Sequence, residues 1–438
     1  MSGARATTAM PTAKTVLATR ATKATRTVAV LGAVFICSLG LSGCWDMFDI
    51  EQRAFVDAVG VDVAQSPPKT GGGGGTDRGG RTLEKVEPED VGLGKTQKRI
   101  VITVEIPIIS QLAGGGGGGG DGGGAGKKPA WVLSASGSTL FEANRELATM
   151  SNRRLFYGHL KTIVISEEAA KAGVQPLLDF FERGREPLQP TKLAVALGRA
   201  DKALQISPKL DKLAGTYLNT LLQQDTRTSR MLQTDLGQFL SEIHSRHNSV
   251  LPRLKPGKDQ AKAAGTAVFK HFKLVGWLGE IETRGLTFLL NRVRGGVIMV
   301  TEDTGGRTKG TGITGFEIGN AKTKITPRIV DGKPVFRVTV QAEGVIAERT
   351  SIKPVFSTKT VRAVERKVSA EIKRNMQGTL DKLQKEFKVD VICFGDLLHK
   401  NFPRQWAKWK NTWDDEQFPE ARVDISVVTH VRRVGTTQ

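Results

Sequence analysis

The side chain with the clearest potential for chemistry is the thiol of Cys44, which directly follows Leu41-Ser42-Gly43. Before it come a basic region with five Lys and Arg residues and no acid, and an apolar stretch over residues 28–41. This order is typical of a secretory signal peptide, and the stretch is too short to span a bilayer comfortably. We expect residues 1–43 to be removed as a signal peptide, which makes Cys44 the first residue of the mature chain.

The sequence Leu41-Ser42-Gly43-Cys44 resembles a bacterial lipobox, in which the cysteine receives a diacylglyceryl group. Two acyl chains hold a protein stably on a membrane, whereas a single chain binds only marginally. We therefore expect a lipid on Cys44, with acyl chains such as palmitate, and no other cofactor. An uncleaved membrane-spanning anchor and a plain cleaved signal with an incidental cysteine are the alternatives.

Other groups that could do chemistry are better explained as structural residues. His244 and His247 lie at i and i+3 of an expected helix, but no third metal ligand follows at a fitting spacing. Asp390, Asp396 and His399 could act as acids or bases, yet they lie at a helix-to-loop junction among phenylalanines, where capping is favoured. The sequence also has no nucleophile elbow and no zinc-protease or phosphate-loop motif. We therefore expect neither an enzyme nor a metal protein.

Three tryptophans form the most distinctive cluster near the end of the sequence. Trp406, Trp409 and Trp413 lie at i, i+3 and i+7, which is one face of a helix. Core packing is the first interpretation. The alternative is a surface for a partner or a membrane, because tryptophan is enriched at protein interfaces and at headgroup depth. Lys408 and Lys410 beside them suit an anionic lipid surface.

The charge of the chain needs no nucleic acid to explain it. The 438 residues include 64 Lys+Arg and 44 Asp+Glu, a formal charge of +20, and loss of the five basic leader residues lowers it to +15. Basic residues close to an anionic membrane are favourable, and the sequence contains no recognition module for nucleic acid. Of the three cysteines, Cys37 leaves with the signal peptide and Cys44 is acylated. Only Cys393 remains, as a core thiol, so the mature chain has no internal disulfide.

Hydrophobic periodicity predicts a multi-domain α+β fold with mixed or antiparallel sheets flanked by helices. Residues 44–199 contain strand and helix patterns and form the expected first α+β domain. Residues 200–258 have a helical period and end in a stretch rich in proline and lysine, which suggests a boundary. Residues 259–438 form the expected second α+β domain.

Two patterns refine these domains. Glycine-rich tracts near residues 71–75 and 114–124 predict loop insertions in the first domain, and neither has the lysine that a phosphate-binding loop requires. Apolar residues recur every three or four positions from Val361 to Phe387 and predict one long amphipathic helix in the last domain.

Several short stretches, taken in order, resemble the Ger(x)C spore germination lipoproteins, which are the C subunits of germinant receptors in spore-forming bacteria. The stretches are Gly43-Cys44-Trp45-Asp46, Gly60-Val61-Asp62, Gly158-His159-Leu160-Lys161-Thr162-Ile163-Val164-Ile165-Ser166, Val250-Leu251-Pro252-Arg253, Gly265-Thr266-Ala267-Val268-Phe269, Leu274-Val275-Gly276-Trp277-Leu278, Glu282-Thr283-Arg284-Gly285-Leu286, Phe387-Lys388-Val389-Asp390, Phe394-Gly395, Phe402-Pro403-Arg404-Gln405-Trp406 and Trp413. No single stretch is decisive, but their shared order makes chance agreement improbable. The two glycine-rich insertions and the long leader depart from the family pattern.

The resemblance implies a non-enzymatic subunit that is anchored by lipid to the outer face of the spore inner membrane. Its implied partners are a large membrane-embedded A subunit and a transporter-like B subunit, and the small-molecule germinant is bound by those partners. The family has no established catalytic residues, so the resemblance assigns none here. A lipoprotein that binds a small nutrient directly, in a pocket between domains, is the alternative function.

Overall fold

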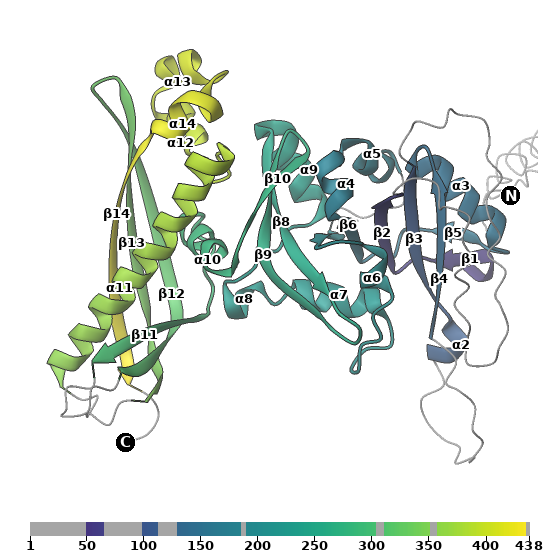
Figure 1. Cartoon of the computed structure of the whole chain (residues 1–438), viewed down its shortest axis with the longest axis horizontal. Coiled ribbons are helices and arrows are strands. Elements are labelled where there is room, and N and C mark those ends of the chain that lie inside the picture. The colour runs from purple at the N-terminus through teal and green to yellow at the C-terminus, as the bar shows by residue number, and fades with distance from the viewer. Residues whose placement is uncertain are drawn as a thin grey trace, which may run out of the picture. The chain divides into compact units, whose positions relative to one another are not determined.

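The computed structural model describes residues 50–64, 99–112, 129–184, 190–303, 311–350 and 357–434. The expected signal peptide, Cys44 and both glycine-rich tracts lie outside these residues. The chain divides into two units, residues 1–53 and 54–438, and the second unit contains nearly all of the described elements. Its packed helices and sheets confirm the expected α+β class (Figure 1).

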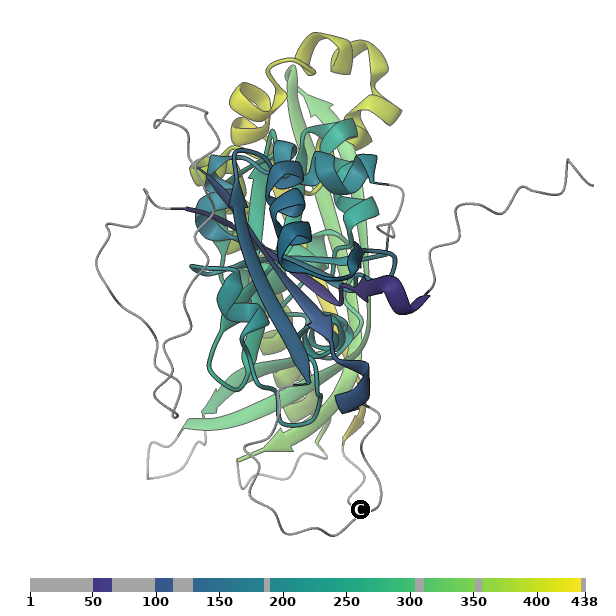
Figure 2. The ribbon, with the colours of Figure 1, turned by 90° about the vertical axis from the view of Figure 1, so that its right-hand side faces the viewer.

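The first part of the second unit is built on an eight-stranded mixed sheet. In spatial order the strands are β10 (Lys273–Leu278), β9 (Ala261–Lys270), β8 (Asn248–Pro256), β7 (Lys192–Ala196), β6 (Thr162–Ser166), β2 (Ala58–Val63), β3 (Ile100–Pro107) and β4 (Ala130–Gly137). The central strands β8, β7, β6 and β2 are parallel neighbours. The outer pairs are antiparallel, and Figure 2 shows β3 and β4 side by side as the long blue strands.

Helices cover both faces of the central strands, so β2, β6 and β7 are buried along their whole length. One face packs against α3 (Leu140–Met150), α4 (Glu167–Ala172), α5 (Gln175–Arg183) and α9 (Leu236–Arg246). The other face packs against α6 (Asp201–Leu204) and α7 (Ala214–Leu222). Side chains alternate between these two layers, with Val59 and Val61 in the first and the smaller Ala58 in the second.

A four-stranded sheet forms the last part of the unit. Its strands in order are β11 (Val297–Asp303), β12 (Thr311–Val330), β13 (Lys333–Arg349) and β14 (Arg422–Val434). The first three strands are antiparallel, whereas β14 is parallel to β13. Helix α11 (Thr358–Asp381) runs along one face (Figure 1), and burial alternates along β13 as expected for a sheet covered on one side. The predicted apolar stripe is confirmed, since Val364, Val368 and Ile372 of α11 are buried in this core.

Shorter elements complete the fold. They are η1 (Ile50–Gln52), β1 (Arg53–Phe55), α2 (Ile109–Leu112), β5 (Arg154–Phe156), α8 (Asp225–Thr228), α10 (Glu280–Leu289), η2 (Lys382–Phe387), α12 (Phe394–Asn401), α13 (Pro403–Trp409), η3 (Trp413–Gln417) and α14 (Phe418–Glu420). Of these, η2 is a π-helical turn that continues α11 to Phe387, so the long predicted helix reaches its expected end with a change of pitch.

The eight-stranded sheet extends across the expected domain boundary at 258/259. The expected helical segment 200–258 ends in strand β8, and the hairpin that follows it adds β9 and β10 to the eight-stranded sheet. Pro252, one of the two prolines in the stretch that suggested a boundary, lies at a register shift between β8 and β9. A bulge of this kind is where a sheet tolerates a residue without an N–H group, so the proline marks an irregularity within the strand.

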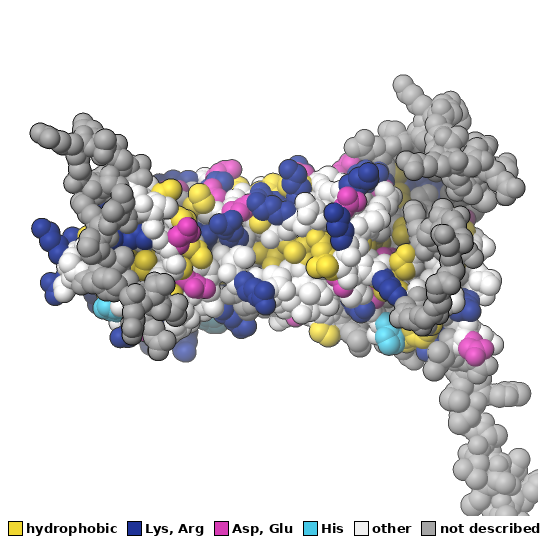
Figure 3. Space-filling model, turned by 90° about the horizontal axis from the view of Figure 1, so that it is seen from below, with side chains coloured by type: hydrophobic (Ala, Val, Ile, Leu, Met, Phe, Trp, Pro, Cys, Tyr) yellow, Lys and Arg dark blue, Asp and Glu magenta, His cyan; other side chains and the backbone are white. Residues whose placement is uncertain are grey.

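Charged side chains are dispersed over the surface. In Figure 3, Lys and Arg side chains lie among uncharged and acidic ones on the face shown. Many basic residues form local ion pairs, as Arg183 does with Asp179 and Arg199 with Asp201. Exposed pairs of this type contribute little to stability, so these surface charges are not what holds the fold together.

A close contact between α10 and α11 joins the two parts of the unit through Gly285. A Cβ atom at Gly285 would overlap Thr379 Oγ1 and the carbonyl oxygen of Asn375, so only glycine permits this approach. Thr379 Oγ1 also donates a hydrogen bond to the carbonyl oxygen of Glu282 at 2.7 Å, and Lys382 forms a salt bridge with the Glu282 carboxylate at 3.0 Å. The helices are therefore held both by close packing and by polar contacts.

Gly285→Ala is expected to destabilise the protein by about 1–3 kcal/mol, because the new methyl group must push α10 away from α11. Gly378→Ala is the matched control, since Gly378 lies in α11 with nothing within 4 Å of an added Cβ, and the exchange there should be neutral or stabilise by about 1 kcal/mol. Urea unfolding of both variants measures the difference. Equal effects would contradict the packing argument.

Candidate functional site

Asp390 is a buried carboxylate at the end of the stretch Phe387-Lys388-Val389-Asp390. Its Oδ1 accepts a hydrogen bond from the N–H of Phe394 at 3.1 Å, and its Oδ2 accepts from the N–H of Gly395 at 2.7 Å and from Trp413 Nε1 at 2.9 Å. Burial raises the pKa of Asp390 to about 6, although these three donors favour the charged form. Asp390 therefore anchors the start of α12, which agrees with the capping role expected for it.

The aromatic residues around this anchor are packed into the core of the four-stranded sheet. The ring of Phe394 stacks on Phe336 with centroids 4.1 Å apart. At Gly395, an added Cβ would lie 2.7 Å from the ring of Trp406, so glycine allows the tryptophan to pack against α12. The side chain of Asp390 and these rings thus hold α12 and α13 against the four-stranded sheet.

The three tryptophans do not lie together on one exposed helix face. Trp413 is only 5% exposed and belongs to η3, not to α13, so the interpretation of it as a partner or membrane surface is wrong. Trp406 and Trp409 share α13 and are partly buried against the same core. The chain turns between α13 and η3, which breaks the helical spacing that the sequence suggested.

A second set of contacts joins Val250-Leu251-Pro252-Arg253 to Gly265-Thr266-Ala267-Val268-Phe269. Arg253 Nε donates to the carbonyl oxygen of Ala264 at 2.8 Å, and its guanidinium lies over Gly265, whose φ of +92° favours glycine. The next residue, Thr266, accepts a hydrogen bond from Thr283 Oγ1 at 3.0 Å. These stretches therefore connect β8, β9 and α10.

The edge strand β10 is held against the turn η2 by a third contact. A Cβ at Gly276 would overlap the ring of Phe387, so the glycine leaves space for the phenylalanine. Phe387 begins the stretch that ends in Asp390. Through these contacts, the residues that carry the family resemblance link the eight-stranded sheet to the elements that pack on the four-stranded sheet.

Near the other end of the eight-stranded sheet, charged groups are buried around the start of α7. The Glu105 carboxylate accepts from the N–H groups of Ala214 at 2.8 Å and Gly215 at 2.6 Å. The neighbouring Asp57 forms a salt bridge with Lys161 at 2.8 Å. Burial raises the pKa of Glu105 to about 7, and the two N–H groups oppose that rise. The arrangement caps a helix and gives no acid or base access to a ligand.

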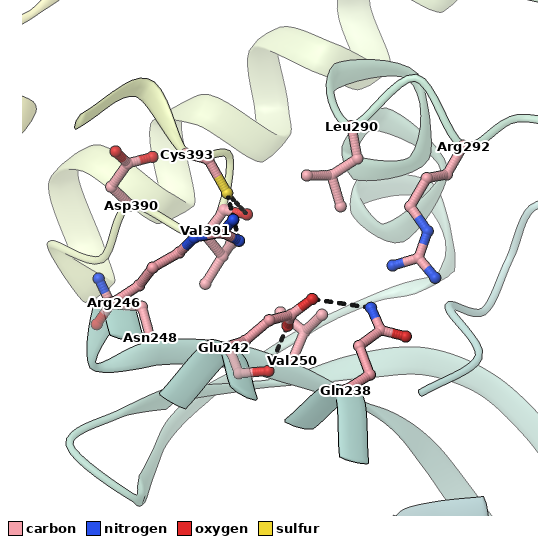
Figure 4. A pocket seen from close by; sticks show the side chains of 11 residues that line it. Gln238, Glu242, Arg246, Asn248, Val250, Leu290, Arg292, Asp390, Val391 and Cys393 are labelled. Atoms are coloured by element: carbon pink, nitrogen blue, oxygen red, sulfur yellow. Dashed lines mark hydrogen bonds between the residues drawn. The ribbon is translucent and has the colours of Figure 1, made fainter. Parts of the chain in front are cut away.

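A polar cleft lies between α9, the segment after α10 and the turn at residues 390–393 (Figure 4). Its volume is about 250 Å³, just below the range of about 300–1,000 Å³ that is typical of ligand pockets, so it has room only for a small molecule. Gln238, Glu242 and Arg246 project from α9, and Arg292 points toward them from the opposite side. Val250, Leu290 and Val391 supply apolar wall between these groups.

The sequence analysis did not identify this cleft. The available signal was the spacing of Gln238, Glu242 and Arg246 at i, i+4 and i+8, which places a polar stripe opposite the apolar face of α9. The contribution of Arg292 could not be read from the sequence, because it depends on how α10 packs beside β8 and β9.

The other side chains considered for chemistry are not brought together. Within the part of the chain that the structure describes, no group of three His, Cys, Asp or Glu side chains could hold a metal. His244 lies 3.6 Å from Glu182, whereas the ring of His247 lies 5.2 Å from that of His271. Asp396 pairs with Arg246 at 2.7 Å, so it does not form an acid–base pair with Asp390.

Cys393 and His399 likewise have packing roles. Burial raises the pKa of the Cys393 thiol to about 12, and Arg246 donates a hydrogen bond to its sulfur at 3.2 Å. A thiol with such a pKa is an inert nucleophile at neutral pH. The ring of His399 stacks on Trp406 with centroids 6.2 Å apart.

Asp390→Ala is expected to destabilise the protein by about 3 kcal/mol at pH 7, because it leaves two buried N–H groups and the indole N–H without an acceptor. Asp179→Ala, which removes only an exposed ion pair with Arg183, should have a much smaller effect on stability. The midpoint of urea unfolding and the near-ultraviolet signal of tryptophan report both changes. A loss at Asp390 no larger than the loss at Asp179 would refute the anchoring role.

Glu105 is expected to make stability depend on pH. Since the folded state raises its pKa from 4.5 to about 7, its contribution is fully present below pH 4.5 and is lost as the pH rises through 7. The unfolding free energy of the natural chain, relative to Glu105→Gln, should therefore fall by up to about 3 kcal/mol over this interval. Parallel unfolding curves at pH 4.5 and 8 measure this change, and a constant difference between the two proteins would count against it.

Two family models match consecutive parts of this chain. The model described as spore germination protein N-terminal domain matches residues 88–256, and the model described as spore germination B3/GerAC like, C-terminal, matches residues 264–435. Spore germination proteins YndF and KC of Bacillus subtilis (strain 168) are each 27% identical to this chain. The alignments cover 92% of this chain and 96% of YndF, and 90% of this chain and 93% of KC.

A solved structure shares the fold. The crystal structure of the GerBC protein aligns with a TM-score of 0.53 and 23% identity, over 76% of this chain and 94% of that one. Among the described residues, no helix is both long enough and apolar enough to cross a membrane. The two family models meet within the β8–β9 hairpin and together match most of the sequence. The chain therefore belongs to the Ger(x)C family of spore germination proteins.

Proposed function

We propose that this protein is a lipid-anchored, non-catalytic subunit of a spore nutrient germinant receptor, and that it acts in receptor assembly and signalling. The observation that carries the proposal is the match of both family models over most of the chain. The relatives bear the names of spore germination proteins, including B3 and A3 of Bacillus subtilis (strain 168). We place the protein on the outer face of the spore inner membrane, beside membrane-embedded A and B subunits.

The packing of the family stretches supports a role without catalysis. Asp390, Arg253 and Gly285 each hold neighbouring elements together, and none of them presents a free reactive group. Residues used in this way give a rigid body that can transmit force or binding energy between partners. We further propose that the diacylglyceryl group on Cys44 is the only attached non-protein group and that no metal or cofactor is needed.

Cys44→Ala is expected to abolish incorporation of a labelled fatty acid and to release the protein from the spore membrane fraction, because the two-chain anchor is lost. Cys37→Ser is the matched control, since Cys37 lies within the expected signal peptide, and it should leave both labelling and membrane association unchanged. Labelled lipid on the Cys44→Ala protein would refute the assignment.

The same two variants test the receptor role. Spores with Cys44→Ala are expected to respond poorly to the nutrient of their own receptor and normally to the nutrients of other receptors. Co-purification of the A and B subunits with the Cys37→Ser protein, and their loss from the Cys44→Ala protein, would place the anchor in assembly. A normal nutrient response by Cys44→Ala spores would show that the anchor is dispensable.

A further inference from the structure

Two opposite charges in the cleft of Figure 4 have no ionic partner among the residues that the structure describes. Glu242 accepts hydrogen bonds from Gln238 Nε2 at 2.8 Å and from Ser249 Oγ at 2.7 Å, but within the described residues it forms no salt bridge. Arg292 donates to the carbonyl oxygen of Gln233 at 3.2 Å and also forms no salt bridge with a described residue. Arg246, by contrast, is already neutralised by Asp396 at 2.7 Å.

The two charges are fixed in place on separate elements. Glu242 lies on α9, and its two hydrogen bonds hold the carboxylate at the floor of the cleft. Arg292 follows α10, and its guanidinium points toward that floor from the other side (Figure 4). They do not pair with each other across the space between them. A partly enclosed cation and anion of this kind interact most favourably with a ligand that carries one negative and one positive group.

The remaining wall sets the size and polarity of such a ligand. Val250, Leu290 and Val391 line the cleft between the charged groups, and the volume of about 250 Å³ excludes a large molecule. A guanidinium binds a carboxylate through two parallel hydrogen bonds, whereas a carboxylate such as Glu242 accepts from an ammonium group. Both ends of a small zwitterion are thereby matched, and its aliphatic part faces the apolar wall.

We propose that this cleft binds a small aliphatic zwitterion, whose carboxylate is held by Arg292 and whose ammonium group is held by Glu242. The proposal goes beyond the receptor role, because the isolated chain can bind such a ligand whether or not partner subunits are present. It also assigns a function to the junction between the two parts of the unit, since a ligand here would contact α9, the segment after α10 and the turn beside Asp390.

The test compares three molecules that differ only in their charged ends. L-Valine carries both groups, isovalerate lacks the ammonium group, and isobutylamine lacks the carboxylate. Calorimetric titration of the full chain, purified in detergent, is expected to show saturable binding of valine, with isovalerate and isobutylamine at least about tenfold weaker. No saturable binding of valine, or equal binding of valine and isovalerate, would overturn the proposal.

Two variants identify the binding groups. Arg292→Gln should weaken valine binding by at least about tenfold, whereas Arg294→Gln, two residues further in the same segment and exposed, should leave it unchanged. Glu242→Gln should instead reduce the ratio of valine affinity to isovalerate affinity. Partial misfolding would lower the binding of both ligands equally, so it would not change this ratio. Thermal unfolding of each variant confirms that it is folded. Valine binding that is unaffected by Arg292→Gln would place the ligand elsewhere and refute the assignment.

Discussion

The convergence of three N–H donors on the buried carboxylate of Asp390 is the interaction on which the second half of this structure depends. A carboxylate removed from water is stable only if its oxygens find donors, and here the start of α12 and the indole of Trp413 provide them. Because Val391 and Cys393 follow directly, the same bonds also set the position of one wall of the cleft. Fold and candidate site thus share one anchor.

The family stretches share a common physical character. They combine a glycine that permits close approach with a polar or aromatic side chain that occupies the space, as Gly265 does with Arg253 and Gly276 with Phe387. Such pairs tolerate little change on either side, because a Cβ would clash and a smaller partner would leave a cavity. In this chain, therefore, the residues of the family stretches join neighbouring helices and strands.

Much of the architecture could be predicted from the sequence. The apolar period from Val361 to Phe387 predicted the helix that covers the four-stranded sheet, because burial of one face imposes that period. The end of the middle segment was harder to predict, since Pro252 resembles a breaker unless the bulge between β8 and β9 is known. The tryptophan spacing misled for a similar reason, as a turn of the chain separates Trp409 from Trp413.

The parallel pairing of β13 with β14 has a consequence for how the protein reaches its folded state. Strand β13 ends at Arg349 and β14 begins at Arg422, with α11 to α14 between them. Until that last strand docks, one long edge of β13 has no hydrogen-bonding partner, and closing so large a loop is entropically slow. The chain therefore passes through an interval in which the edge of β13 can pair with other chains, and this interval is where aggregation competes most strongly with folding.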